Sequence, residues 1–162
     1  PKSDRTKKKL HAPHTPSFPS LCALATQKIT SSPTRTTRSG CKTIVVAGAT
    51  GGRLDHLAGN LSAFGKYARR ARITFVEEWG EAVYVGSQLT LELPPGTVIS
   101  LIPLSRCEGI VTQGLKWELR NGMLELGLWE STSNEVRLTP VVIKVRRGNL
   151  LLYRVYDAHA GR

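Results

Sequence analysis

Cysteine is scarce in this sequence, and long apolar runs are absent. The three cysteines, Cys22, Cys41 and Cys107, are an odd number and form no CxxC pair, which argues against a disulfide framework or a zinc site. No run approaches the roughly 20 consecutive apolar residues that cross a bilayer, and no secretory h-region lies near the start. We therefore expect a cytoplasmic protein that contacts no membrane.

Acidic residues are also few, with 12 against 23 Lys and Arg, which gives a formal net charge of +11. Such an excess suggests nucleic acid as a partner. Residues 1–42 contain nine basic residues and one acidic residue, whereas residues 43–162 contain 14 and 11. The excess of basic residues therefore lies mainly in the first 42 residues. In the remaining chain basic and acidic residues are interleaved, which is typical of a solvated surface. Nucleic-acid binding is therefore disfavoured. Any affinity for nucleic acid that comes from the basic tail would be abolished by deletion of residues 1–42.

Residues 1–42 are rich in Ser, Thr, Pro, Lys and Arg, a composition that buries too little apolar surface to become ordered. We predict a basic leader that is disordered or aberrant, such as the product of a wrong exon or a frameshift. Its acid-poor composition is similar to that of organellar transit peptides, so organellar import is not excluded.

The remaining chain shows an α/β pattern up to about Trp79 and an all-β pattern after it. A β-branched run at 43–47, a glycine-rich loop, a helical pattern over 53–70 and a run at 73–76 predict one α/β unit. After Trp79 the period becomes two, which predicts several short strands. The predicted fold class is α/β plus all-β, with a partial α/β unit at 43–78 followed by an antiparallel β-sandwich at 82–157.

Three details of this pattern are specific enough to test. An apolar stripe on the helix comprises Leu54, Leu57, Ala58, Leu61 and Phe64. Alternating leucines at 124, 126 and 128 predict a strand, and the runs at 141–145 and 150–155 predict a closing hairpin.

The string GATGGRLDH at 48–56 is the most informative local motif. Glycines after a strand allow backbone amides to approach a phosphate at a helix N-terminus, which makes Gly48, Gly51 and Gly52 a candidate nucleotide or phosphate loop. The alternative interpretation is that the last two glycines only form a turn, and that Asp55 caps the helix or balances its dipole.

A dinucleotide-binding interpretation of the same loop is weaker. The G-x-x-G-x-x-G pattern needs glycine where Leu54 stands, although Glu77 or Glu78 at the end of the next strand could act as the ribose-binding acid. A nucleotide-dependent oxidoreductase fragment therefore remains an alternative, and the all-β region that follows disfavours it.

Three further motifs follow in the β region: SLIPLS at 100–105, GLKW at 114–117 and STSNE at 131–135. Each is weak alone. A tryptophan on a strand is more often part of a core, and a Ser/Thr/Asn cluster is more often a turn.

Together with GATGGRLDH, these motifs resemble those of the thiamine pyrophosphokinase family in order and approximate spacing, over about residues 43–157. The resemblance implies transfer of a pyrophosphoryl group from ATP to thiamine, giving thiamine diphosphate and AMP, with Mg²⁺ required. It also implies a homodimer in which an α/β domain binds the nucleotide, a β-sandwich binds thiamine, and each protomer supplies half of a site.

The resemblance assigns roles to individual residues. Arg53 and Asp55 are the predicted catalytic residues, with Asp55 also a Mg²⁺ ligand, and Trp117, Ser133 and Asn134 are predicted to bind thiamine. Charge neutralisation suits phosphoryl transfer, and an aromatic face suits the thiazolium cation.

One part of the family pattern is missing from this sequence. Family members have acidic motifs upstream of the glycine loop, whereas no Asp or Glu lies between Asp4 and Asp55. A non-catalytic thiamine-binding or dimerisation module is therefore the alternative to a thiamine pyrophosphokinase.

Overall fold

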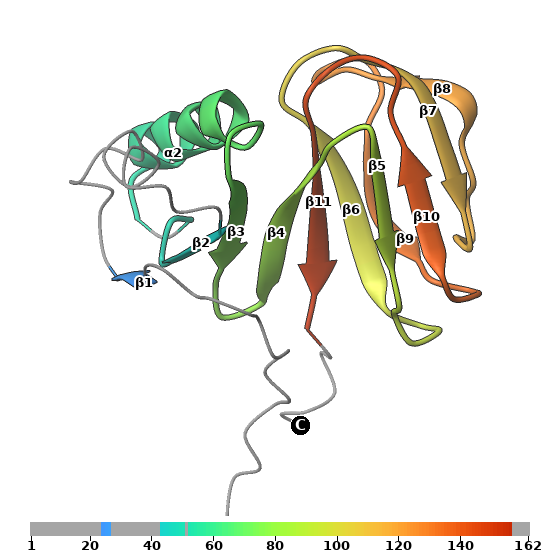
Figure 1. Ribbon diagram of the computed structural model, residues 1–162, viewed down its shortest axis with the longest axis horizontal. Helices are drawn as coiled ribbons and strands as arrows, with labels where there is room; N and C mark the ends of the chain where they lie inside the picture. The colour runs from blue at the N-terminus through green and yellow to red at the C-terminus, as the bar shows by residue number, and fades with distance from the viewer. Residues whose placement is uncertain (1–23, 27–42, 51, 157–162) are drawn as a thin grey trace, which may run out of the picture.

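Figure 1 shows a computed structural model of the chain, which describes residues 24–26, 43–50 and 52–156. Two sheets and one helix form this part of the chain. None of its helical segments is long and apolar enough to cross a membrane. The predicted leader, apart from residues 24–26, and the predicted loop residue Gly51 lie outside the described residues.

The larger sheet is mixed and has seven strands in the order β1-β2-β3-β4-β11-β6-β9. The bounds of its strands are β1 Leu24–Thr26, β2 Thr43–Ala47, β3 Arg72–Val76, β4 Gly80–Val85, β11 Leu150–Val155, β6 Val98–Pro103 and β9 Ser131–Glu135. The sheet thus runs without a break through the predicted α/β unit and into the predicted sandwich.

The α/β unit forms one end of this sheet. Helix α2 (Leu54–Tyr67) connects β2 to β3, and these two strands pair in parallel, so the predicted crossover is present. Strand β1 pairs with β2 in parallel on its other side. Residues 24–26 lie in the segment that composition assigned to the leader, and nothing in that composition indicated a strand there.

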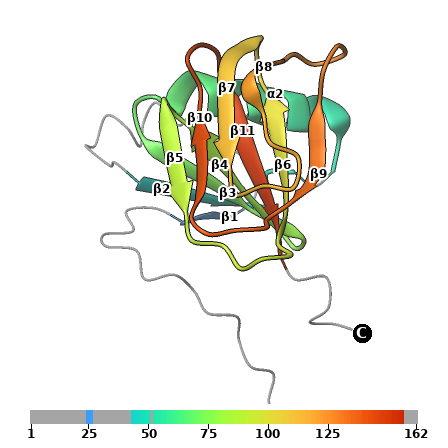
Figure 2. The same cartoon turned by 90° about the vertical axis from the view of Figure 1, so that its right-hand side faces the viewer.

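The smaller sheet is antiparallel and packs on the β4-β11-β6-β9 side of the larger one, as Figure 2 shows. Its order is β5-β10-β7-β8, with bounds β5 Gln88–Leu91, β10 Val141–Lys144, β7 Cys107–Gln113 and β8 Arg120–Leu124. The two sheets enclose an apolar core, to which Ile99 and Ile143 contribute from opposite layers. The predicted β-sandwich is therefore present.

Strand β11 contributes to two cores at once. Leu150 and Leu152 lie in the core between the sheets, whereas Leu151 lies in a second core beneath α2. Successive side chains on a strand point to opposite faces, so α2 covers the face of the sheet that is turned away from the sandwich. In the second core the rings of Phe64 and Phe75 meet edge to face, with centroids 4.7 Å apart.

The predicted closing hairpin is wrong. Strand β10 pairs with β5 and β7 in the smaller sheet, whereas β11 pairs with β4 and β6 in the larger sheet. The connection between them crosses from one layer to the other at Gly148, whose φ of 109° favours glycine. A Cβ at this position would lie 2.5 Å from the Arg106 carbonyl oxygen.

Two further predictions need correction. The alternating strand through 128 ends at Leu124, because Gly127, with φ 83°, forms a tight turn. Leu126 is 74% exposed there. On α2, Leu54 and Ala58 are exposed, so the buried stripe is shorter than predicted and centres on Phe64.

Candidate functional site

The glycine loop lies at the carboxyl ends of β2 and β3, where open α/β sheets bind ligands. Gly48 leaves β2 with φ 69°, and its N–H donates to the Val76 carbonyl at 3.2 Å. The Asn60 amide on α2 donates to the Ala49 carbonyl at 2.7 Å. These bonds hold the start of the loop against the next strand and the helix.

The two predicted catalytic residues lie together at the start of α2. Arg53 is the N-cap residue, and its guanidinium donates to both carboxylate oxygens of Asp55, at 3.1 and 2.7 Å. Both side chains are exposed. The N-cap residue is Arg53 and has no side-chain cap hydrogen bond, whereas Asp55 lies in the first turn, where a carboxylate is favourably placed in the helix dipole.

The Arg53 guanidinium also holds the pKa of the Asp55 carboxyl below its ordinary value. Asp55 therefore offers an ionised carboxylate oxygen at neutral pH, the kind of ligand that a hard cation prefers. Within residues 24–26, 43–50 and 52–156, no group of three or more His, Cys, Asp or Glu side chains gathers into a metal-binding cluster. A Mg²⁺ ion at this position would thus find fewer than three such side chains gathered among the described residues.

Glu77 connects the loop to β11. The Thr50 hydroxyl donates to one carboxylate oxygen of Glu77, and the Tyr153 hydroxyl donates to the other. Burial and the neighbouring Glu77 raise the pKa of Tyr153, which keeps its hydroxyl protonated as a donor. Gly80 makes room for this ring, because a Cβ there would lie 2.7 Å from the Tyr153 hydroxyl oxygen.

Sequence reasoning considered Glu77 only as a ribose-binding acid and did not find Tyr153. The tyrosine is separated from Glu77 by 76 positions, and only the pairing of β4 with β11 brings the two together. No local signal in the sequence marks that contact.

An open hollow of about 610 Å³ lies beside the loop. Its lining includes Gly48 and Thr50 from the loop and the turn Glu77, Glu78 and Trp79 between β3 and β4. Trp79 is 68% exposed. The volume is within the range of small-molecule sites.

The predicted thiamine-binding residues gather at the other edge of the larger sheet. Asn134 on β9 is 3% exposed, and its amide nitrogen donates to the Trp117 carbonyl at 2.8 Å. Its amide oxygen accepts from the Trp117 and Glu135 N–H groups at 3.2 and 2.8 Å. Asn134 therefore fixes the backbone of Trp117, and this side chain is largely occupied by protein partners.

Trp117 itself is not part of a core, because it is 58% exposed. The Lys116 ammonium lies 4.8 Å from the ring centroid and pairs with Glu135 at 3.1 Å. Ser133 is exposed next to Asn134 in the chain, in the left-handed region with φ 54°, and its N–H donates to the Ser100 hydroxyl oxygen at 3.0 Å. The STSNE motif is thus a strand rather than a turn.

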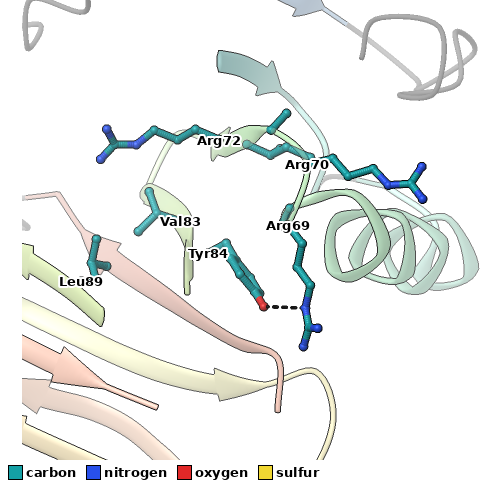
Figure 3. A pocket seen from close by; sticks show the side chains of 9 residues that line it. Arg69, Arg70, Arg72, Val83, Tyr84 and Leu89 are labelled. Carbon is teal, nitrogen blue, oxygen red and sulfur yellow. Dashed lines mark hydrogen bonds between the residues drawn. The ribbon is translucent and has the colours of Figure 1, made fainter. Parts of the chain in front are cut away.

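A second hollow of about 370 Å³ lies at the opposite end of α2 (Figure 3). Arg69 lies along Tyr84 and donates to its hydroxyl at 3.3 Å, while Arg70 and Arg72 extend away from that ring. None of the residues predicted from the sequence lines this hollow.

Comparison with known proteins gives a family match for residues 87–150, to the family described as thiamin pyrophosphokinase, vitamin B1 binding domain. Thiamin pyrophosphokinase 1 of Caenorhabditis elegans is 34% identical in an alignment 115 residues long, which covers 62% of this chain and 44% of that protein. The chain thus spans less than half the length of this curated relative.

Two solved structures share the fold. The thiamin pyrophosphokinase of Geobacillus thermodenitrificans has a TM-score of 0.69 and 27% identity, covering 79% of this chain and 60% of that one. The thiamine pyrophosphokinase of Bacillus subtilis has a TM-score of 0.69 and 23% identity, covering 77% and 60%. The sequence match over residues 87–150, the curated relative and the shared fold together show that this chain is similar to thiamine pyrophosphokinases.

Proposed function

We propose that the chain acts in thiamine pyrophosphokinase chemistry, in which the hydroxyl oxygen of thiamine attacks the β-phosphorus of ATP. The bond between that phosphorus and the α–β bridging oxygen breaks, the hydroxyl loses its proton, and the products are thiamine diphosphate and AMP. The observation that supports this proposal most is the exposed Trp117 ring beside Ser133, within the region that matches the vitamin B1 binding family.

The thiamine half is suited to a flat cation. An indole face attracts cations, with an energy of about 0.5–2 kcal/mol that depends on desolvation. Lys116 already places a cation over Trp117, so the ring is oriented for this kind of contact. Because Asn134 holds the Trp117 backbone, the base of this side chain is fixed without a ligand, which reduces the entropy lost on binding.

The phosphate half is suited to anions. Gly48 and Gly52 place backbone with positive φ before the N-terminus of α2, where free N–H groups and the helix dipole favour phosphate. Arg53 would neutralise charge on the transferred phosphoryl oxygens. Asp55 would hold Mg²⁺ together with nucleotide phosphates and water, and the ion would supply charge neutralisation across the phosphates.

The two halves are too far apart in one protomer to react directly. Strands β2 and β9 are separated by five inter-strand steps in the sheet, which at about 4.8 Å each amount to roughly 24 Å. Reacting atoms must approach to about 3–3.5 Å. We therefore propose a homodimer in which the loop of one copy faces the Trp117 region of the other.

A non-catalytic thiamine-binding module is the second candidate. It is favoured by the lack of a group of three or more metal-binding side chains among the described residues, and by the absence of acidic residues between Asp4 and Asp55. Such a module would keep Trp117 and Asn134 but would not consume ATP.

Titration calorimetry of thiamine into the full chain, followed by an assay for AMP release with Mg²⁺ and ATP, tests both candidates. We expect thiamine to bind, and Trp117→Ala to weaken binding by roughly tenfold. Trp129→Ala is the matched control, because Trp129 is similarly exposed in the β8–β9 connection. Thiamine binding without AMP release would favour the module, and a folded chain that binds no thiamine would refute both.

A further inference from the structure

The hollow beside the glycine loop has a wall that the phosphate chemistry does not use. Phosphate oxygens would meet backbone amides and Arg53 at the start of α2, whereas Glu78 and Trp79 stand across the hollow at the end of β3. We propose that this turn binds the nucleoside of the nucleotide, with the base stacked on Trp79 and the ribose hydroxyls donating to Glu78. This inference rests on the proposed function and assigns a subsite within it.

The position of the turn follows from topology. In a strand–loop–helix–strand unit that binds a nucleotide, phosphates lie at the helix N-terminus, and an acid at the end of the second strand accepts the ribose hydroxyls. Strand β3 is that second strand here, and it is followed directly by two glutamates. The same hollow is lined by Gly48, Thr50 and this turn, so one ligand can contact both.

The structure distinguishes between the two glutamates. Each carboxylate oxygen of Glu77 already accepts a hydrogen bond, one from Thr50 and one from Tyr153. Glu78 is exposed and makes no hydrogen bond or ion pair within the described part of the chain. Glu77 is therefore a positioning residue that holds the loop, and Glu78 is the carboxylate free to accept from a diol.

Trp79 is suited to a stacking role because its position is fixed while its side chain is exposed. Its carbonyl accepts a hydrogen bond from the Tyr156 N–H at 2.9 Å, and the Glu77 N–H donates to the Gly80 carbonyl at 2.9 Å. The turn is thus tied to the end of β11 and closed on itself. The indole is 68% exposed, and an aromatic face of this kind stacks with any nucleobase.

Titration calorimetry on the full chain with three probes tests the proposal: AMP, 2′-deoxy-AMP and inorganic pyrophosphate. We expect AMP to bind more tightly than 2′-deoxy-AMP. Only AMP has the 2′-hydroxyl that can donate to Glu78, and a hydrogen bond to a charged acceptor is stronger than one to a neutral acceptor. Glu78→Gln should reduce this preference to about one, while Glu130→Gln, at another exposed glutamate, should leave it unchanged. Pyrophosphate affinity should be the same in all three proteins.

Trp79→Ala should weaken AMP binding by roughly tenfold, Trp79→Phe should restore most of it, and Trp129→Ala should have no effect. An AMP affinity that is unchanged in Trp79→Ala, an unchanged preference in Glu78→Gln, or no AMP binding by the parent chain would each overturn the proposal. Failure of the proposed function is distinct: AMP would bind as expected, but thiamine would not bind or no AMP would be released from ATP.

Discussion

At the β9 edge of the larger sheet, Asn134 is 3% exposed and makes three hydrogen bonds to the backbone of Trp117 and Glu135. At the start of α2, the side chains of Arg53 and Asp55 are 75% and 59% exposed and hydrogen-bond to each other. The thiamine half is therefore rigid before any ligand arrives. The phosphate half presents a charge pair that a ligand or a second protomer must rearrange.

The link between the two halves is the turn that leads into β4, and Gly80→Ala should break it. A Cβ at Gly80 would lie 2.2 Å from the Arg154 carbonyl oxygen and 2.7 Å from the Tyr153 hydroxyl oxygen. Because a backbone atom cannot move aside cheaply, we expect a loss of at least about 3 kcal/mol in the free energy of unfolding, measured with urea. Gly86→Ala is the control, since a Cβ there meets no atom within 4 Å. Equal stability of the two variants would contradict this account.

Asn134→Ala tests the rigidity of the thiamine half. It leaves two part-buried N–H groups and one carbonyl without their partner, so we expect the free energy of unfolding to fall by about 1–2 kcal/mol. Thiamine affinity should fall with it, whereas pyrophosphate affinity should not change. Thr132→Ala, at an exposed position on the same strand, should have little effect on either. Loss of stability with normal thiamine binding would show that the Trp117 backbone does not need this amide.

Tyr153→Phe tests the phosphate half in the same way. Removal of the hydroxyl leaves Glu77 with one fewer donor, and we expect a loss of about 1 kcal/mol in unfolding free energy. Pyrophosphate affinity should fall because Thr50 loses a fixed partner, while thiamine affinity should not. Tyr84→Phe removes hydrogen bonds to Arg69 and Asn149 far from the loop, so it should cost similar stability with no effect on pyrophosphate.

The smallest expected effect concerns the exposed pair. Arg53 lowers the pKa of Asp55 from its ordinary value of 3.8. The pair therefore contributes its small stabilisation above about pH 4, and the contribution is lost as the pH falls through the lowered value. In Arg53→Ala, a carboxyl NMR titration should show the Asp55 pKa rising toward 3.8. Arg70 makes no ion pair among the described residues, so Arg70→Ala should leave the Asp55 pKa unchanged. An Asp55 pKa that does not rise in Arg53→Ala would contradict the pairing.

Local patterns in the sequence were sufficient for β2, β3 and the crossover between them, but not for β1 or for the end of β8 at Leu124. The run at 43–47 and the strand near 73–76 have the expected bounds to within one residue, because burial on both faces leaves an apolar run that any assignment finds. The GATGGRLDH motif also predicted that Arg53 and Asp55 lie together, because they are two positions apart at the start of one helix.

Contacts between layers could not be predicted in this way. A short glycine-containing connection between two strands is typical of a hairpin, but whether β11 pairs with β10 or with β4 depends on both apolar cores. The Asn134 amide was predicted to bind thiamine, whereas its position beneath Trp117 requires the pairing of β6 with β9. The period of a strand shows which residues are buried, not which strand covers them.

Because β11 lies inside the larger sheet, between β4 and β6, and places alternate leucines in both cores, neither core stays intact when the other unfolds. Heating should accordingly produce a single transition, with tryptophan fluorescence and far-ultraviolet dichroism changing together. A fragment that ends before Leu150 would lose the strand from both interiors at once. Strand β11 is therefore required for the stability of both cores, although the other strands precede it in the chain.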